Sequence, residues 1–204
     1  PTSCVPTVGA MEGCFASLAL ASGRIRGRRT VLFLDPGFPV NRLQARFLGA
    51  PVAIIDFHDH RGDKLLSAVE ERAAQGDLCA ILYSSPNNPS WIVLKEPELK
   101  GLAEICDRHD LIAIEDLAYF GMDTREDYFT PGEPPYQPTV MRYTDRAICI
   151  VSSSKIFSYA GQRIALAIIP PGLMDMESPD LVKQFGTANV GHAFLHGALY
   201  PITA

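Results

Sequence analysis

Residues 79–117 begin with the apolar run CAILYSS (79–85), pass through a helical segment EPELKGLAEICDRHD (96–110) and end with a second apolar run, LIAIEDL (111–117). In the middle segment Leu99, Leu102 and Cys106 recur at the spacing of one helix face, which indicates an amphipathic helix. Two apolar runs joined by such a helix predict a βαβ unit. The strands of such a unit lie parallel and are covered by helices on both faces of the sheet.

The same alternation of short apolar runs and helical segments extends along most of the chain. Strands are expected at 31–35, 51–57, 79–85, 111–117, 147–152 and 164–169, and helices at 9–21, 40–48, 64–75, 96–110 and about 180–196. We therefore predict an α/β fold with three layers, α/β/α, around a mostly parallel sheet. Residues 121–144 carry four prolines and no periodicity, which favours a long loop.

The composition excludes several classes of protein. The 204 residues, 47% hydrophobic and 20% charged, suffice for one domain with a sizeable core, and the net charge of −5 gives no electrostatic footprint for nucleic acid. No apolar run approaches the ~20 residues that a membrane span needs. Five scattered cysteines without CxxC spacing favour a reduced, cytoplasmic protein. The chain begins with Pro1 and not with Met, so we expect it to be a piece of a longer protein.

Polar side chains gather where the expected strands end. They lie in the segments DPGF (35–38), SSPNNP (84–89), EDLAY (115–119) and SSSK (152–155). In open α/β sheets, ligands bind beyond the carboxyl ends of the strands. We therefore expect one binding site built from these segments.

Four side chains in these segments are suited to chemistry or binding. Desolvation and nearby cationic charge would favour a neutral, nucleophilic amine at Lys155, although an isolated loop lysine is more often simply solvated. Asp116 ends an apolar run, so its carboxylate needs a cationic or hydrogen-bonding partner, unless it caps the next helix. Tyr119, three residues further, would share its side of a helical turn. Asn88 either donates an amide hydrogen bond to a ligand or serves only its turn.

Three further motifs bear on phosphate, metal and nucleophile chemistry. The segment VGAMEG (8–13) opens a predicted helix, and its free N–H groups suit a phosphate, although it is neither GxGxxG nor a P-loop. His192 and His196 are four residues apart but lack the glutamate of HExxH and a third ligand, so no metal site is expected. The serines lack the G-x-S-x-G elbow of serine hydrolases.

Together these segments resemble the class I/II aminotransferase family of fold type I pyridoxal-phosphate (PLP) enzymes, over about residues 7–170. The strongest likeness is SSSKIFSYAGQR (152–163), which is similar to the cofactor-lysine signature of that family. The remaining segments follow in the family's order: TVGAME (7–12) resembles the phosphate-cup turn, DPGFP (35–39) the segment that carries an aromatic ring, SSPNNPS (84–90) the Asn-Pro turn, and EDLAY (115–119) the Asp-x-x-Tyr element.

The resemblance implies a role for each residue. Lys155 would form a Schiff base with the cofactor aldehyde and move the proton between the substrate Cα and the cofactor, while Asp116 would keep the pyridine nitrogen protonated. Tyr119, the third residue implied in catalysis, and Asn88 would hydrogen-bond the phenolic oxygen of the cofactor. The phosphate ligands implied are Arg163, Ser152, Ser154 and the backbone N–H groups of Gly9, Ala10 and Met11, and Phe38 would stack on the ring.

The implied function is a PLP-dependent aminotransferase, a homodimer that transfers an amino group between an amino acid and a 2-oxo acid. Two alternatives share these motifs: a PLP-dependent C–S β-lyase, and the PLP-binding effector domain of a transcription regulator, which requires a helix-turn-helix upstream. Family members are longer and bind the substrate carboxylate with an arginine from their carboxyl-terminal part. We therefore expect residues 1–204 to form a single PLP-binding large domain of a longer two-domain enzyme.

Two positions depart from the family pattern. Trp91 and Ala165 stand where glycine is usual. The Trp91 ring is expected to pack under its loop, and the alternative is a wall that narrows the substrate pocket. Neither position carries a reacting group, so the departures concern the shape of the substrate site more than cofactor binding.

Overall fold

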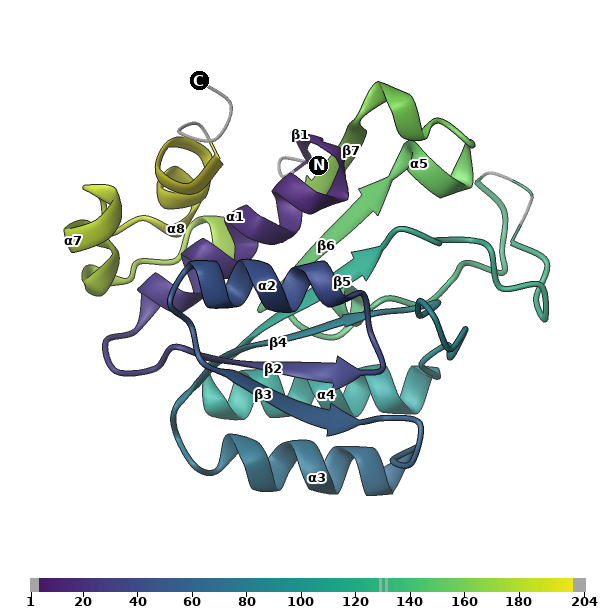
Figure 1. Cartoon of the computed structure of the whole chain (residues 1–204), viewed down its shortest axis with the longest axis horizontal. Coiled ribbons are helices and arrows are strands. Elements are labelled where there is room, and N and C mark those ends of the chain that lie inside the picture. The colour runs from purple at the N-terminus through teal and green to yellow at the C-terminus, as the bar shows by residue number, and fades with distance from the viewer. Residues whose placement is uncertain (1–3, 129, 131, 200–204) are drawn as a thin grey trace.

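A computed structural model describes residues 4–128, 130 and 132–199 (Figure 1). Its sheet has the strand order β1-β7-β6-β5-β4-β2-β3. The strands are β1 Cys4–Val8, β2 Thr30–Asp35, β3 Val52–Asp56, β4 Leu78–Ser84, β5 Ile112–Leu117, β6 Ala147–Ser152 and β7 Ile164–Ile168. Strands β3, β2, β4, β5 and β6 pair in parallel, whereas β7 pairs antiparallel with both β6 and β1. The predicted mostly parallel sheet is therefore confirmed.

Helices cover both faces of the sheet, which gives the predicted three layers (Figure 1). Helices α1 Gly9–Arg24 and α2 Pro39–Phe47 lie on one face, and α3 Asp63–Ala73 and α4 Glu96–His109 lie on the other. Each face has its own cluster of buried apolar side chains. Successive residues of a strand point to opposite faces, so Ile114 packs on the α1 side and Leu117 on the α4 side. Asp116 and Glu115, which lie between them, are divided between the two faces in the same way.

The prediction of one continuous helix at about 180–196 is wrong. The segment forms the short α7 Val182–Phe185 and α8 Val190–His192, preceded by a 3-10 turn at Pro179–Leu181 and followed by a π-helical segment at Ala193–Leu199. Gly186 ends α7 in the left-handed conformation, with φ +72°, and this breaks the run. The side chain of Asn189 then accepts a hydrogen bond from His192 N–H and starts a new helix.

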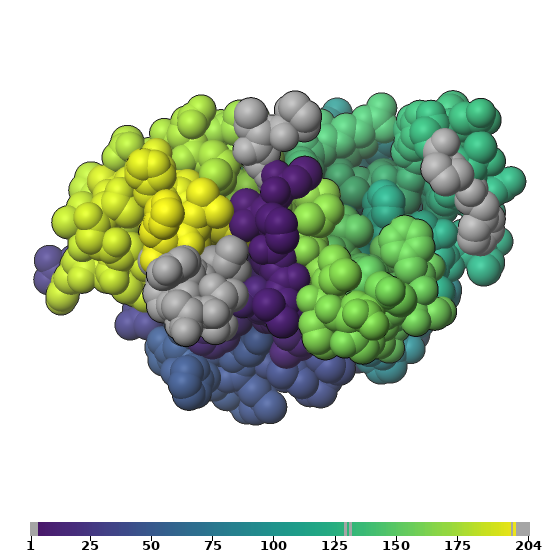
Figure 2. Space-filling model, turned by 90° about the horizontal axis from the view of Figure 1, so that it is seen from above, coloured from purple at the N-terminus to yellow at the C-terminus, as the bar shows by residue number. Residues whose placement is uncertain are grey.

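Strand β1 was not expected from the sequence. It is an edge strand that contains Pro6, and of its residues only Thr7 is buried, so it lacks the apolar run on which the other assignments depend. In Figure 2 the N-terminal segment lies between the C-terminal segment and the segment around α5 Ser153–Ile156. The remaining short elements are α6 Pro171–Met174 and 3-10 turns at Val140–Arg142 and Ala160–Gln162, and the other described residues of the loop at 121–144 form no helix or strand.

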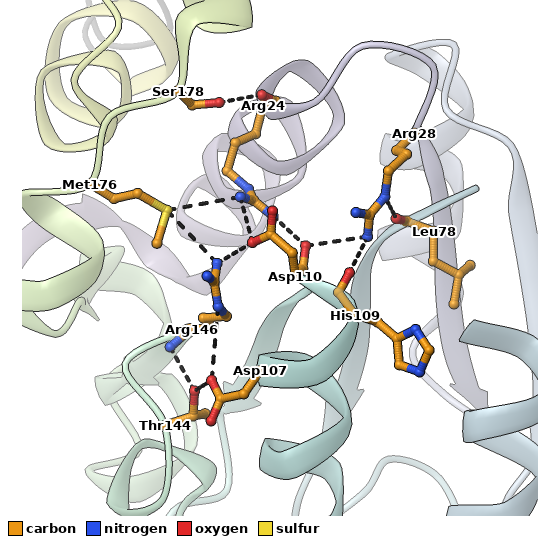
Figure 3. Close-up of polar contacts among 10 residues, drawn as sticks. All are labelled: Arg24, Arg28, Leu78, Asp107, His109, Asp110, Thr144, Arg146, Met176 and Ser178. Carbon is orange, nitrogen blue, oxygen red and sulfur yellow. Dashed lines mark hydrogen bonds and ion pairs between the residues drawn. The ribbon is translucent and has the colours of Figure 1, made fainter. Parts of the chain in front are cut away.

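An ionic cluster joins the elements near the amino ends of the parallel strands (Figure 3). Arg24 from α1 and Arg146 from the start of β6 both pair with Asp110, at the end of α4, and Arg24 reaches its Oδ1 at 2.9 Å. Arg28 donates to backbone carbonyls in the same turn, and Ser178 Oγ donates to the carbonyl of Arg24. The cluster therefore fixes α1, α4, β6 and the segment after β7 to one another. In the described part of the chain, no helix has the length and apolarity to cross a membrane.

Candidate active site

A cavity of about 260 Å³ opens beyond the carboxyl ends of the central parallel strands. Its lining includes all of the predicted site residues except Gly9: Ala10, Met11, Phe38, Asn88, Asp116, Tyr119, Ser152, Ser154, Lys155 and Arg163. Ser84, Ala118 and Ala160 also line it; they belong to the predicted segments but had no individual role. The structure thus brings together in one place segments that are up to about 150 residues apart in the chain.

Asp116 lies at the base of the cavity, at the end of β5, with 8% of its surface exposed. Burial raises the pKa of its carboxyl to about 6, and hydrogen bonds from Ala118 N–H, at 3.1 Å from Oδ1, and from the Asn41 side chain act in the opposite direction. No basic side chain pairs with it among the described residues. The carboxylate is therefore a buried acid that lacks a cationic partner.

Asn41 is a site residue that sequence reasoning missed. It belongs to α2, is 3% exposed, and its Oδ1 has no hydrogen-bond partner within the described residues. Asn41 and Ala45 are the two buried residues of that helix and lie one turn apart. A polar residue in register with a buried alanine on a predicted helix is the sequence signal that could have identified it.

An anion seat lies where α1 begins. Gly9 has φ +72°, a backbone conformation that favours glycine, and the guanidinium of Arg163 fills the space that a Cβ would take. The antiparallel pairing of Val8 with Ile164 sets these two residues side by side. Arg163 donates to the carbonyl of Ala160 at 2.9 Å and lies 3.4 Å from Ser154 Oγ. A guanidinium, a hydroxyl and the N-terminus of a 16-residue helix thus converge.

One carboxylate and one hydroxyl close to this seat already make hydrogen bonds within the protein. Glu12, in the first turn of α1, accepts a hydrogen bond from Val8 N–H, and so its carboxylate caps the start of the helix. Ser152 is 2% exposed, and its Oγ accepts a hydrogen bond from Ser154 N–H at 3.2 Å at the start of α5. The Ser152 hydroxyl can still donate to a ligand, because a hydroxyl both accepts and donates.

Lys155 belongs to α5 and lines the cavity, but its side chain is exposed. The expected partial desolvation of this amine stays a prediction. In the described part of the chain its ammonium has no hydrogen bond or ion pair. It is thus a lysine held at the site by its backbone and free to react with a ligand there.

Aromatic and amide side chains also form part of the cavity wall. Asn88 and Tyr119 are half-buried, and Phe38 is 40% exposed. Trp91 does not pack under its loop as expected: it is 42% exposed and its ring meets that of Tyr119, with centroids 5.4 Å apart and planes at 72°. The indole therefore contacts Tyr119, which lines the cavity, but does not line the cavity itself.

Glu115 and the histidines lie outside the cavity. Glu115 points to the α4 face, where it is fully buried and accepts a hydrogen bond from Val140 N–H at 3.0 Å, and burial raises its pKa to about 7. Its role is thus to anchor the end of the long loop. The rings of His192 and His196 lie 6.0 Å apart, and the described residues contain no group of three or more His, Cys, Asp or Glu side chains that could hold a metal.

Comparison with known proteins identifies the family of the chain. The family model "Aminotransferase class I and II" matches residues 5–189, and the chain belongs to this family. Relatives include LL-diaminopimelate aminotransferase of Oleidesulfovibrio alaskensis, 30% identical over 145 residues, and aspartate/prephenate aminotransferase of Thermus thermophilus, 24% identical over 196 residues. The matches cover 68% and 92% of this chain but 34% and 48% of those proteins, so the chain spans less than half the length of these relatives.

Solved structures with this fold include an aminotransferase from Eubacterium rectale and cystalysin from Treponema denticola, which contains pyridoxal 5′-phosphate. The first has a TM-score of 0.68 at 20% identity and covers 97% of this chain and 48% of its own. Cystalysin has a TM-score of 0.62 at 21% identity and covers 83% of this chain and 42% of its own. The fold class predicted from the sequence, a three-layer α/β/α fold like that of the large domain of PLP-dependent transferases, agrees with these structures.

Proposed function

We propose that this chain binds PLP in the cavity beside Lys155 and serves an aminotransferase that moves an amino group between an amino acid and a 2-oxo acid. The observation that carries the proposal is the placement around one cavity of a lysine amine and a buried carboxyl, both without an ion-pair partner among the described residues, and an arginine at a helix N-terminus. Each of these groups matches one part of PLP: the aldehyde, the pyridine nitrogen and the phosphate.

The residues present fit the cofactor by their own chemistry. The seat formed by Arg163, Ser154 and the start of α1 offers charge-assisted hydrogen bonds to a dianion. Asp116 is buried and has no cationic partner in the part of the chain that the structure describes, and a protonated pyridine nitrogen would supply one. The cofactor, when bound, supplies an aldehyde that condenses with an amine and a ring that accepts the electron pair left at the substrate Cα.

Each remaining role falls to a residue of this chain. The Lys155 amine would hold the cofactor through its aldehyde, and as the free amine it would carry the proton from the substrate Cα to the cofactor C4′. Asp116 keeps a proton on the pyridine nitrogen. Tyr119 and Asn88 donate to the phenolic oxygen, and Phe38 covers one face of the ring.

We further propose that residues 1–204 form the PLP-binding large domain of a longer, two-domain enzyme, and that the group binding the substrate carboxylate lies elsewhere. This is supported by the share of the relatives that the chain spans. Residues 1–3 and 200–204 lie outside the described residues. The substrate pair is then set by parts that this cavity does not contain.

Self-association as a homodimer is part of the proposal, and exposed apolar side chains on α2 support it. Phe47 is 83% and Leu43 57% exposed, and Phe47 meets the ring of Phe15 at 6.1 Å. A solution mass that stays at one chain as concentration rises would contradict this part.

The five cysteines form no disulfide, and all except Cys4 are buried, which supports placement in the reduced cytoplasm.

Titration with PLP tests the cofactor assignment. The purified protein should develop an absorption band near the visible, and Lys155→Ala should abolish it. The matched control Lys183→Ala removes another exposed lysine and should leave the band intact. A band that persists in Lys155→Ala, or that is absent from the parent protein, would overturn the assignment.

A C–S β-lyase is the second candidate, since solved structures with this fold include the PLP-bound C–S lyase from Staphylococcus hominis, with a TM-score of 0.65 at 18% identity. Incubating the PLP-loaded protein with an S-alkyl cysteine and, separately, with an amino acid and a 2-oxo acid distinguishes the two. Release of thiol and ammonia supports the lyase, whereas formation of a new amino acid supports the aminotransferase.

A further inference from the structure

The loop after β4 fixes the backbone of Trp91. Asn87 is fully buried, and its side chain donates to Ser84 Oγ at 3.2 Å and accepts from Ser90 Oγ at 2.7 Å. Its backbone N–H donates to the carbonyl of Ile92, and its carbonyl accepts from Trp91 N–H, each at 2.9 Å. The backbone at Trp91 is therefore set by a closed network of hydrogen bonds and not by its own side chain.

Trp91 occupies this position at a cost in both backbone and side chain. Its φ is +58°, in the left-handed region that is strained for a bulky residue. Its indole is 42% exposed and belongs to neither of the two apolar cores. Core packing thus does not explain a tryptophan at this point in the loop.

The contact of the indole with Tyr119 does explain it. The two rings meet edge to face, with centroids 5.4 Å apart and planes at 72°, which is a favoured aromatic geometry. Within the described residues the Tyr119 hydroxyl makes no hydrogen bond. The ring of Tyr119 lines the cavity, as does Asn88 from the loop that carries Trp91. The indole therefore contacts a ring of the cavity wall.

We propose that Trp91 is a positioning residue for Tyr119, and that it sets the hydrogen bond of the Tyr119 hydroxyl to the phenolic oxygen of a bound PLP. The cofactor half of this inference rests on the proposed function, whereas the ring contact does not. Trp91 is the only tryptophan of the chain, so its fluorescence reports on this contact alone.

Fluorescence of the cofactor-free protein tests the ring contact. In Tyr119→Ala the indole loses its neighbour, so its emission should move to longer wavelength and its quenching by iodide should increase. Tyr119→Phe keeps the ring and should resemble the parent protein, as should Tyr136→Ala, which alters a tyrosine that is 63% exposed elsewhere. Unchanged emission and quenching in Tyr119→Ala would overturn the contact.

PLP binding, followed by the cofactor's own absorption, tests the positioning role. Trp91→Gly suits the left-handed backbone and so folds, and it should weaken PLP binding by roughly two- to twelvefold, the value of an aromatic pair. A hydroxyl that donates to the phenolic oxygen lowers the proton affinity of that oxygen. The pH midpoint of the cofactor's absorption should therefore rise in Trp91→Gly towards the value of Tyr119→Phe, while Trp91→Phe should stay close to the parent.

The outcomes separate the two proposals. A parent-like midpoint and affinity in Trp91→Gly would refute the positioning role even where PLP binds normally. Absence of PLP binding by the parent protein would refute the proposed function, and with it the role towards the cofactor. The fluorescence result would then still decide whether the rings are in contact.

Discussion

Replacing Asp116 by Asn should stabilise the cofactor-free protein above pH 6 and weaken PLP binding. Burial raises the pKa of this carboxyl from 3.8 to about 6, and its surface is 8% exposed. At about 1.4 kcal/mol per pH unit, this difference corresponds to about 3 kcal/mol of unfolding free energy. Asparagine keeps an oxygen that can accept from Ala118 N–H, so the local turn should persist.

The direction of the effect follows from proton binding. Because the native pKa exceeds the unfolded value, the native state holds this proton between about pH 4 and pH 6 while the unfolded chain releases it. As the pH rises from about 4 to about 6, the unfolding free energy of the parent protein therefore falls. Above about pH 6, Asp116 changes it no further. Asparagine does not titrate, so the variant avoids this loss.

Urea unfolding from about pH 4 to about pH 8 measures the difference. The unfolding free energy of Asp116→Asn minus that of the parent should grow by about 3 kcal/mol across the window. In PLP titrations the order should reverse, since asparagine offers no charge to the pyridine nitrogen. Glu115→Gln, at a buried carboxyl on the other face whose pKa is about 7, should change the pH profile and leave PLP binding intact. Parallel pH profiles for the parent and Asp116→Asn would refute the reasoning.

Two further substitutions probe the anion seat and the ionic cluster. Arg163→Ala should weaken PLP binding by roughly 10- to 150-fold, which corresponds to a charge-assisted hydrogen bond of about 1.5–3 kcal/mol. The affinity of Arg163→Lys should lie between those of Arg163→Ala and the parent. Equal affinities of all three proteins in absorbance titrations would contradict the anion seat. Asp110→Ala leaves Arg24, which is 3% exposed, without its carboxylate partner and should lower the unfolding free energy by about 3 kcal/mol in urea, whereas a loss below about 1 kcal/mol would show that the cluster is dispensable.

Most of the sheet could be predicted because its strands are buried on both faces. The runs at 79–85 and 111–117 correspond to β4 and β5, each of which is buried at every position. Strand β1 escaped prediction because an edge strand with one buried residue leaves no apolar run. The helix expected at 180–196 failed for another reason: Gly186 and Asn189 act as end and start signals within a segment whose composition is otherwise helical.

The site was predictable where one strand or turn dictates position, as for Asp116 at the end of β5. It was less predictable where position depends on a neighbouring element. The exposure of Lys155 depends on the short α5, and the contact of Asn41 with Asp116 depends on how α2 crosses the sheet. The position of Trp91 depends on the hydrogen bonds of a neighbouring asparagine, which the sequence pattern does not reveal.

The antiparallel pairing of β1 with β7 makes the anion seat sensitive to chain length. Val8 opposes Ile164, and this one register brings Gly9 under Arg163 although 154 positions separate them in the sequence. Side chains alternate between the faces of a strand, so a length change of one residue between Thr7 and Gly9 would either turn Thr7 outwards or carry the helix start away from the guanidinium. Such a change could spare every residue assigned to the cofactor and still remove its phosphate seat.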